Sequence, residues 1–351
     1  MRRNGSESAP FEGPPRRILV IPLLLLLFSS SCESGPSNEV ILYCSLDQIF
    51  SEKLIKAFEA ETGIRVKAGY DTEAQKTTGL VNRLLGERNN PQCDVFWNNE
   101  SVLTLHMKSE GILAPYVSPN ATTIPSGFKD PDGYWTGLAA RCRVLIYNTR
   151  KIKEADLPTS ILDLTDPKWK GRFTVARPLA GTTRTHFAVL YDRLGKDAAT
   201  KWFRDLKANV GKVAEGNARV MRMVASGDYE FGITDTDDAN IAKQSGEPVD
   251  TLFLDQGEGQ MGTLVIPNSV MLIKGGPNPE NGQKLIDYIL SVGVEEKLAR
   301  SDSVQIPLHS DATAPANVVT LDSLRPMEVD FGRVAAIIEE ATDILREIYL
   351  D

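Results

Sequence analysis

Histidine and cysteine are scarce in this sequence, whose 351 residues contain three histidines and four cysteines. Three histidines leave little material for a histidine-built zinc site. Four cysteines in a chain of this length do not form a disulfide scaffold. Basic charge is also in deficit, since 47 acidic residues face 39 lysines and arginines and the formal net charge is −8. A broad nucleic-acid surface needs a basic face, so no nucleic-acid partner is expected.

Sequence motifs of common enzymes are missing as well. We find no H-E-x-x-H, no G-x-S-x-G and no obvious spacing of a nucleophile and its base. The pair Gly195-Lys196 does not form a phosphate loop, because Leu190 stands where the first glycine is needed and Asp197 where Ser or Thr is needed. We therefore expect a protein that is not an enzyme. A hydrolase built from distant Asp and Glu is the rival interpretation.

What is present is the balance of an ordinary folded protein. Hydrophobic residues make up 42% and charged residues 25% of the chain, which predicts a sizeable core. At roughly 100–200 residues per domain, the length indicates about two domains, or one large one.

The N-terminus has the pattern of an export signal. Arg16 and Arg17 precede a short apolar run at 18–28, which is followed by three serines and Cys32. The run is shorter than the roughly 20 residues that span a bilayer, so the pattern is typical of a cleaved secretory signal. We predict an exported protein, with lipidation of Cys32 or plain cleavage near it. The predicted segments are a signal peptide at 1–32 and a polar tether at 33–39.

The rest of the chain alternates strand and helix patterns. Val40–Cys44 is a continuous apolar run, typical of a buried strand, and Phe50 to Phe58 show helical spacing that Gly63 stops. Ile64–Ala68 is the next strand, and a strand–helix–strand unit predicts a parallel sheet. Further strands are predicted at 94–97, 143–147, 172–175, 229–234, 262–267 and 270–273, and helices around 80–85, 103–107, 198–207, 282–290 and 331–349.

Polar loops that follow strands are the places to expect a ligand. In parallel α/β sheets the carboxyl ends of strands meet at one edge, where ligands bind. The loops of this kind are Ser45–Gln48, Asn98–Ser101, Ala180–Arg184, Glu215–Asn217 and Asp235–Asp238.

Three cysteines follow the export signal, at Cys44, Cys93 and Cys142. Their number is odd and no C-x-x-C spacing occurs, so we predict small buried side chains. One disulfide between two of them is the alternative.

A series of short segments between Val40 and Leu308 resembles one family: the extracellular solute-binding proteins of bacterial ABC importers, specifically their ferric-ion-binding group. No single segment is decisive, but their order and spacing together are specific. The segments are Leu42–Ser45, Phe58–Ile64, Pro91–Trp97, Gly111–Pro115, Arg141–Asn148, Asp166–Arg172 and Val224–Gly227.

The resemblance implies a type II periplasmic-binding fold, an α/β fold of two lobes with mixed, mostly parallel sheets and two hinge strands. It implies crossings between the lobes near Ala139 and Thr263. It also implies a monomer that delivers its solute to an ABC permease driven by a cytoplasmic ATPase. The implied ranges are lobe 1 at 40–138 and 263–310, lobe 2 at 139–262, and a C-terminal helical segment at 311–351.

The metal ligands of the family are only partly present. Two adjacent tyrosines that commonly hold Fe(III) in relatives fall on Thr236 and Asp237 here, so both phenolates are missing. A histidine of the first loop falls on or near Asp47, and a glutamate falls on Asn99 or Glu100. The strand tyrosine is kept as Tyr147, together with both arginines of that strand, Arg141 and Arg143.

Two ligand classes follow from this comparison. In the first, Fe(III) is the transported ligand, held by hard oxygen ligands and accompanied in some relatives by a synergistic anion. The metal-ligand candidates are Asp47, Glu100, Tyr147 and Asp237. In the second, arginines and helix N-termini bind a small organic anion such as a phosphonate or carboxylate. The full set of candidate ligand-binding residues is Ser45, Asp47, Asn99, Glu100, Arg141, Arg143, Tyr147, Thr182, Thr183, Asn217, Asp235, Thr236 and Asp237.

Each candidate also has a purely structural interpretation. Asp235 and Asp237 precede a helical segment and could only cap it. The same holds for Asp47 and for Asn99 and Glu100. Arg141 and Arg143 alternate on a strand, so they share one face and could form ordinary ion pairs, and Tyr147 could pack in a core.

Overall fold

The computed structural model describes Gly13, residues 38–70 and residues 78–350. Apart from Gly13, the predicted signal peptide, with Cys32, and most of the predicted tether lie outside these described residues. From position 38 onward the described residues belong to one compact unit. None of the described helices is both long enough and apolar enough to cross a membrane.

Strands and helices alternate along most of the described chain. The strands are β1 Glu39–Cys44, β2 Arg65–Tyr70, β3 Val95–Asn98, β4 Leu113–Ala114, β5 Thr136–Asn148, β6 Phe173–Ala176, β7 Lys212–Ala214, β8 Phe231–Asp235, β9 Val249–Leu252 and β10 Val265–Ile273. The helices are α1 Gln48–Thr62, α2 Thr78–Gly86, α3 Val102–Ser109, α4 Gly181–Leu194, α5 Lys196–Asn209, α6 Asn217–Ala225, α7 Thr236–Gln244, α8 Pro279–Ile289, α9 Val292–Ala299 and α10 Phe331–Tyr349.

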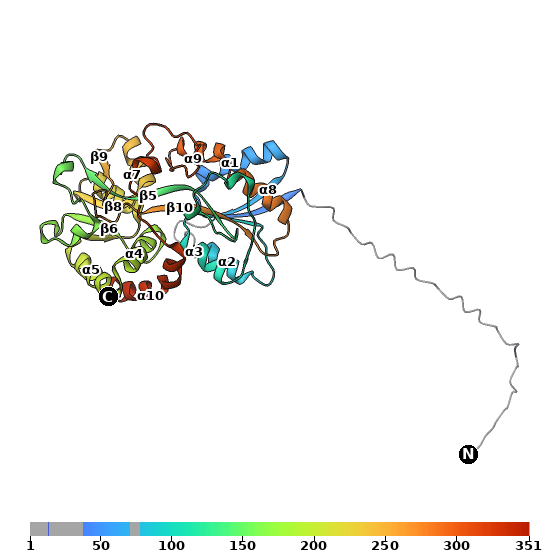
Figure 1. Cartoon of the computed structure of the whole chain (residues 1–351), viewed down its shortest axis with the longest axis horizontal. Helices are drawn as coiled ribbons and strands as arrows, with labels where there is room; N and C mark the ends of the chain where they lie inside the picture. Colours follow the sequence, from blue (N-terminus) through green and yellow to red (C-terminus); the bar gives the residue numbers. More distant parts are fainter. Residues whose placement is uncertain (1–12, 14–37, 71–77, 351) are drawn as a thin grey trace, which may run out of the picture. The chain divides into compact units, whose positions relative to one another are not determined.

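The strands form a mixed sheet in the order β2-β1-β3-β10-β5-β8-β6-β7. β1 pairs in parallel with β2 and β3, which makes the sheet of lobe 1. β6 pairs in parallel with β7 and β8, which makes the sheet of lobe 2. Between them, β5 and β10 run antiparallel through the middle of the molecule (Figure 1). The fold is the two-lobed α/β architecture that the sequence predicts.

The long strand β5 belongs to both lobes. Its first half, Thr136–Cys142, pairs with β10, and its second half, Arg143–Asn148, pairs with β8 and β9. Ala139 lies within the first half and has a positive φ of 35°, a conformation that L-residues rarely adopt. Opposite it, the pairing register shifts between Pro267 and Asn268. The break in the β5–β10 ladder thus lies at Ala139 on β5 and between Pro267 and Asn268 on β10, and the crossings between the lobes near Ala139 and Thr263 stay predictions.

Two sequence predictions of local structure are wrong. The segments 262–267 and 270–273 form one strand, β10, rather than two, because the register shift accommodates Pro267 inside the ladder. Four of the five predicted ligand loops run into the first turns of helices, since α1 begins at Gln48, α4 at Gly181, α6 at Asn217 and α7 at Thr236.

The last helix, α10, has the predicted bounds and completes the core of lobe 2. It packs against α4 and α5 and also against α3 of lobe 1, near the C-terminus in Figure 1. Its buried side chains recur at helical spacing and join the same hydrophobic cluster as α4 and α5. They are Phe331, Val334, Ile338, Ala341, Leu345, Ile348 and Tyr349.

The three described cysteines are free and buried, as the sequence predicts. Burial raises the pKa of the Cys44 thiol to about 12, so this side chain is a small apolar group rather than a reactive thiolate.

Candidate functional site

Arg143 is the centre of a buried polar network in lobe 2. Its Nη1 donates to Asp235 Oδ1 at 2.6 Å, and the two side chains are 1% and 4% exposed. The same nitrogen lies 3.2 Å from the Thr182 hydroxyl and 3.1 Å from Asn217 Oδ1, while Nη2 lies 3.3 Å from the Thr183 hydroxyl. The network joins β5 and β8 to the first turns of α4 and α6.

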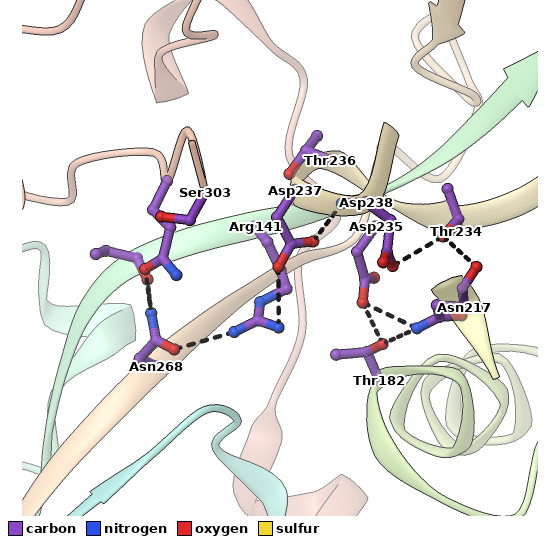
Figure 2. A network of polar contacts seen from close by, with 12 residues as sticks. Arg141, Thr182, Asn217, Thr234, Asp235, Thr236, Asp237, Asp238, Asn268 and Ser303 are labelled. Carbon is purple, nitrogen blue, oxygen red and sulfur yellow. Dashed lines mark hydrogen bonds and ion pairs between the residues drawn. The ribbon is translucent and has the colours of Figure 1, made fainter. Parts of the chain in front are cut away.

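Asp235 is fully engaged within this network. Its second oxygen, Oδ2, accepts from the Thr182 hydroxyl at 2.6 Å and from Asn217 Nδ2 at 3.0 Å (Figure 2). Both oxygens of this buried carboxylate are thus hydrogen-bonded, with a guanidinium alongside, and such charge-assisted bonds are stronger than bonds between neutral groups. We conclude that Arg143, Thr182, Thr183, Asn217 and Asp235 assemble this part of lobe 2.

Arg141, two residues earlier on the same face of β5, has different partners. Its Nη1 lies 3.4 Å from Asp237 Oδ2, with side chains 9% and 19% exposed. Its Nη2 donates to Asn268 Oδ1 at 3.1 Å. Figure 2 shows Arg141 between Asn268 of β10 and Asp237 in the first turn of α7. Arg141 therefore contacts both the turn Asp235–Asp238, here called the acidic turn, and β10, the strand that runs between the lobes.

The acidic turn gathers three carboxylates. One oxygen from each of Asp235, Asp237 and Asp238 can lie within 4.8 Å of the others, a spacing compatible with a metal ion. Asp238 accepts from the Thr234 hydroxyl at 3.0 Å. The Thr236 hydroxyl accepts from the Cys142 amide at 3.2 Å, which ties the turn to β5.

Lobe 1 contributes Asp47 to the same group. This residue precedes α1, is exposed, and interacts electrostatically with both Arg141 and Asp237. Burial raises the pKa of Asp237, an effect that Arg141 opposes and that Asp235 and Asp47 reinforce. The structure brings Asp47, Arg141 and Asp237 together, and their shared role in binding a ligand stays a prediction.

The site carries an excess of negative charge. Asp47, Asp235, Asp237 and Asp238 act on Arg141, and Arg143 is the second guanidinium of the group. Four formal negative charges thus face two positive ones. Among these groups carboxylates outnumber guanidiniums, a balance that favours a cation over an anion.

Tyr147 does not belong to this site, so its prediction as a metal ligand beside Asp237 is wrong. It lies four residues beyond Arg143 on β5, about 13 Å along the strand, and pairs with Phe231 and Asp250. Its hydroxyl donates to Glu154 at 3.3 Å, and burial raises its pKa to about 12. Tyr147 has the same strand parity as Arg141 and Arg143, but its side chain lies in the core of lobe 2.

Glu100 is a helix cap. Its carboxylate accepts from the amides of Val102 at 2.7 Å and Leu103 at 2.8 Å, at the start of α3. Burial raises its pKa, and these bonds oppose the shift. Its Oε2 also lies 3.5 Å from the Thr185 hydroxyl of α4. Both oxygens accept structural hydrogen bonds, and its predicted role as a metal ligand stays a prediction.

Two further predicted residues lie in the loops that follow the strands of lobe 1. Ser45 follows β1 directly, and its buried hydroxyl has no hydrogen-bond partner among the described residues. Asn99 follows β3 and is half-buried. Their predicted contact with a ligand stays a prediction.

Sequence analysis missed Asn268 and Gln305. Asn268 is fully buried and bonds Arg141 through Oδ1 and Gln305 Oε1 through Nδ2 at 2.7 Å. A polar residue inside the apolar run of β10 was the available signal, since a buried amide needs partners. Gln305 lies in an irregular segment that carries no such pattern.

Comparison with known proteins identifies a family whose model this chain matches. The model of the bacterial extracellular solute-binding protein family matches residues 91–329. Iron uptake protein A1 of Synechocystis is 26% identical over 322 residues, covering 89% of this chain and 88% of that protein.

Solved structures agree with the fold. Iron-bound HitA from Pseudomonas aeruginosa superposes with a TM-score of 0.78 and 25% identity, covering 89% of this chain and 99% of that one. AfuA from Actinobacillus pleuropneumoniae, solved with bound fructose-6-phosphate, gives a TM-score of 0.75 and 23% identity, covering 88% and 97%. Proteins with this fold therefore include one solved with iron and another solved with a phosphorylated sugar.

Proposed function

Because this chain belongs to the bacterial extracellular solute-binding proteins, we propose that it is the solute-binding subunit of an ABC importer and that its solute is Fe(III). The solute would bind where the acidic turn of lobe 2 meets Asp47 of lobe 1. Closure of the lobes would then complete its coordination, and a membrane permease would receive it. Contacts made only in the closed state favour that closure.

The single observation that carries the proposal is the cluster of carboxylates at the site. Asp235, Asp237 and Asp238 each have one oxygen within 4.8 Å of the others, and Asp47 acts with them on Arg141. Carboxylate oxygens are ligands that hard cations prefer. A site of this kind binds iron without the paired phenolates that the resemblance led us to look for, and any further donor would come from an anion bound with the metal.

Similarity to named iron proteins supports the metal. Iron uptake protein A1 and iron-bound HitA match this chain over most of their lengths. Fe(III) is the cargo in this proposal and not a catalytic cofactor. We propose binding without turnover, so a solute should be recovered unchanged after release.

A small organic anion is the second candidate. The buried Nε atoms of Arg141 and Arg143 have no hydrogen-bond partner among the described residues, and the first turns of α4, α6 and α7 meet near them. AfuA with fructose-6-phosphate shows that the fold accepts such a ligand. The negative charge around Arg141 opposes an anion, which is why we rank it second.

Export and anchoring complete the proposal. The family acts outside the cytoplasm, and we propose that the segment 1–32 directs export and that Cys32 carries the lipid. We also propose that the protein works as a monomer. Intact mass of the mature protein tests the anchor, because a diacylglycerol on Cys32 adds a defined mass and its absence removes the claim.

The decisive experiment identifies the solute directly. Protein purified without chelator is analysed for metals and by native mass spectrometry, and small-angle scattering compares it with and without ferric citrate. We expect one iron per chain and a more compact particle. A bound organic anion with no metal would replace the first candidate by the second.

A further inference from the structure

The Arg141 side chain occupies the carboxylates that a cationic solute would need. Its Nη1 lies 3.4 Å from Asp237 Oδ2, and Asp235, Asp238 and Asp47 all act on it electrostatically. Arg141 is nearly buried, so its charge is poorly solvated and depends on these partners. A guanidinium in this position partly neutralises these carboxylates when no solute is bound.

The other end of the same guanidinium contacts the crossing between the lobes. Arg141 Nη2 donates to Asn268 Oδ1 at 3.1 Å. The amide of Asn268 in turn donates through Nδ2 to the carbonyl of Ala139 and, at 2.7 Å, to Gln305 Oε1. Asn268 is fully buried, so it cannot exchange these partners for water without a cost in free energy.

Ala139 is the irregular residue of the crossing and is held from both sides. Its positive φ of 35° and the register shift at Pro267 and Asn268 mark the one break in the β5–β10 ladder. Its amide donates to the buried Glu295 carboxylate of α9 at 2.6 Å, while its carbonyl accepts from Asn268. Backbone in this region of φ/ψ space persists only where the surroundings fix it.

These contacts form one continuous chain from the acidic turn to the backbone of the crossing. It runs through Asp237, Arg141 and Asn268, which Figure 2 shows, and ends at the Ala139 carbonyl. We propose that Arg141 is an internal placeholder cation, which the solute displaces from Asp237, and that its displacement is transmitted through Asn268 to the hinge at Ala139. This inference rests on the proposed function, since it takes a cation as the solute.

The mechanism follows from charge. A trivalent cation at Asp237 repels the guanidinium, so Arg141 must leave this partner or turn towards an anion bound with the metal. Either movement changes the bond to Asn268 Oδ1, the only hydrogen-bonded side-chain contact of Arg141 among the described residues. Displacing Arg141 consumes binding free energy, which lowers affinity, and this cost links occupancy of the site to hinge geometry.

The test uses La(III), a hard trivalent ion that stays soluble near neutral pH, with calorimetry for affinity. Arg141→Gln removes the placeholder charge and should bind La(III) at least tenfold more tightly than wild type. Arg172→Gln is the matched control, because Arg172 also pairs with a carboxylate, Glu230 at 2.5 Å, on the opposite edge of the lobe 2 sheet. The control should bind La(III) as wild type does.

Hydrogen exchange of the peptide covering residues 136–142 tests the transmission. We expect La(III) to change exchange there in wild type and in Arg172→Gln. The change should be lost in Asn268→Ala, measured with La(III) at a concentration that saturates each variant. Thermal unfolding of each variant confirms that it is folded before these values are compared.

The outcomes separate the two proposals. If neither wild type nor Arg141→Gln binds La(III), the cation function fails. If wild type binds and Arg141→Gln binds equally or more weakly, the placeholder role is wrong while the function stands. If Asn268→Ala still shows the wild-type change in exchange at 136–142, transmission through Asn268 is wrong.

Discussion

Arg141 and Arg143 lie two residues apart on one face of β5, yet they belong to different kinds of environment. Arg143 and Asp235 are almost completely buried, and both oxygens of Asp235 and both terminal nitrogens of Arg143 are hydrogen-bonded within lobe 2. Arg141 and Asp237 keep a longer contact, and Asp237 retains 19% of its exposure. The first pair holds lobe 2 together, while the second leaves carboxylate oxygens that a solute can reach. An arginine–aspartate pair by itself therefore does not indicate a ligand site. The two pairs differ in whether hydrogen bonds from other side chains occupy both carboxylate oxygens.

The largest effect should come from breaking the saturated pair. Arg143→Met leaves the Asp235 carboxylate buried without its cation, which costs about 3–5 kcal/mol of folding free energy. Arg141→Met should cost much less, since Asp237 can be hydrated. Urea unfolding of both variants measures the difference. Equal losses would show that the two arginines have the same role.

A smaller effect, on binding affinity, is expected at the Arg141–Asp237 pair, where we propose that the solute binds. Asp237→Asn should weaken binding of a trivalent cation at least tenfold, which is about 1.4 kcal/mol, with little change in stability. Asp235→Asn should instead lower stability, because it removes the partner of Arg143. Calorimetric titration with La(III) and thermal unfolding are measured on both. Tighter binding of an organic anion by Asp237→Asn would favour the second candidate solute.

The pH dependence of binding should sharpen the same distinction. Because the pKa of Asp237 is raised, this carboxyl holds its proton to a higher pH than an ordinary aspartic acid, and a cation must displace that proton. Cation affinity should thus fall as the pH is lowered, beginning above the usual 3.8 of Asp. In Asp237→Asn this part of the dependence should vanish. A pH series of La(III) titrations checks it, and an unchanged profile in the variant would contradict the assignment.

The smallest effect is predicted for Tyr147, which lies away from both pairs. Tyr147→Phe removes one hydrogen bond to Glu154 and should cost about 1 kcal/mol or less. It should leave metal affinity and any visible absorption of the iron-loaded protein unchanged. Loss of a visible band in this variant would return Tyr147 to the list of ligands.

Much of the fold could be predicted from the sequence because its signals are local. The apolar run at β1, the glycine stop at Gly63 and the spacing of α10 each depend on neighbours in the chain. Alternation along β5 also predicts that Arg141 and Arg143 share a face. The acids of the turn at Asp235–Asp238 were found because they follow a strand.

What the sequence could not supply depends on distant partners. Tyr147 looks like a ligand by its place in a motif, but the pairing of β5 with β9 places it in the core. Glu100 looks free until the α3 amides take both of its oxygens. The role of Asn268 follows only from its hydrogen bonds with Arg141 and Ala139, which lie more than a hundred residues earlier in the chain.

The pairing of β5 with β10 has a consequence for how the protein is made. Cys142 lies opposite Val265, and the core of lobe 2 includes the side chains of α10. Neither lobe can finish folding until most of the chain has been synthesised, because each takes strands or helices from widely separated stretches. Contacts of such long sequence separation form slowly. For a chain that is exported as we propose, slow folding would keep the polypeptide unfolded for long enough to pass through a translocation channel.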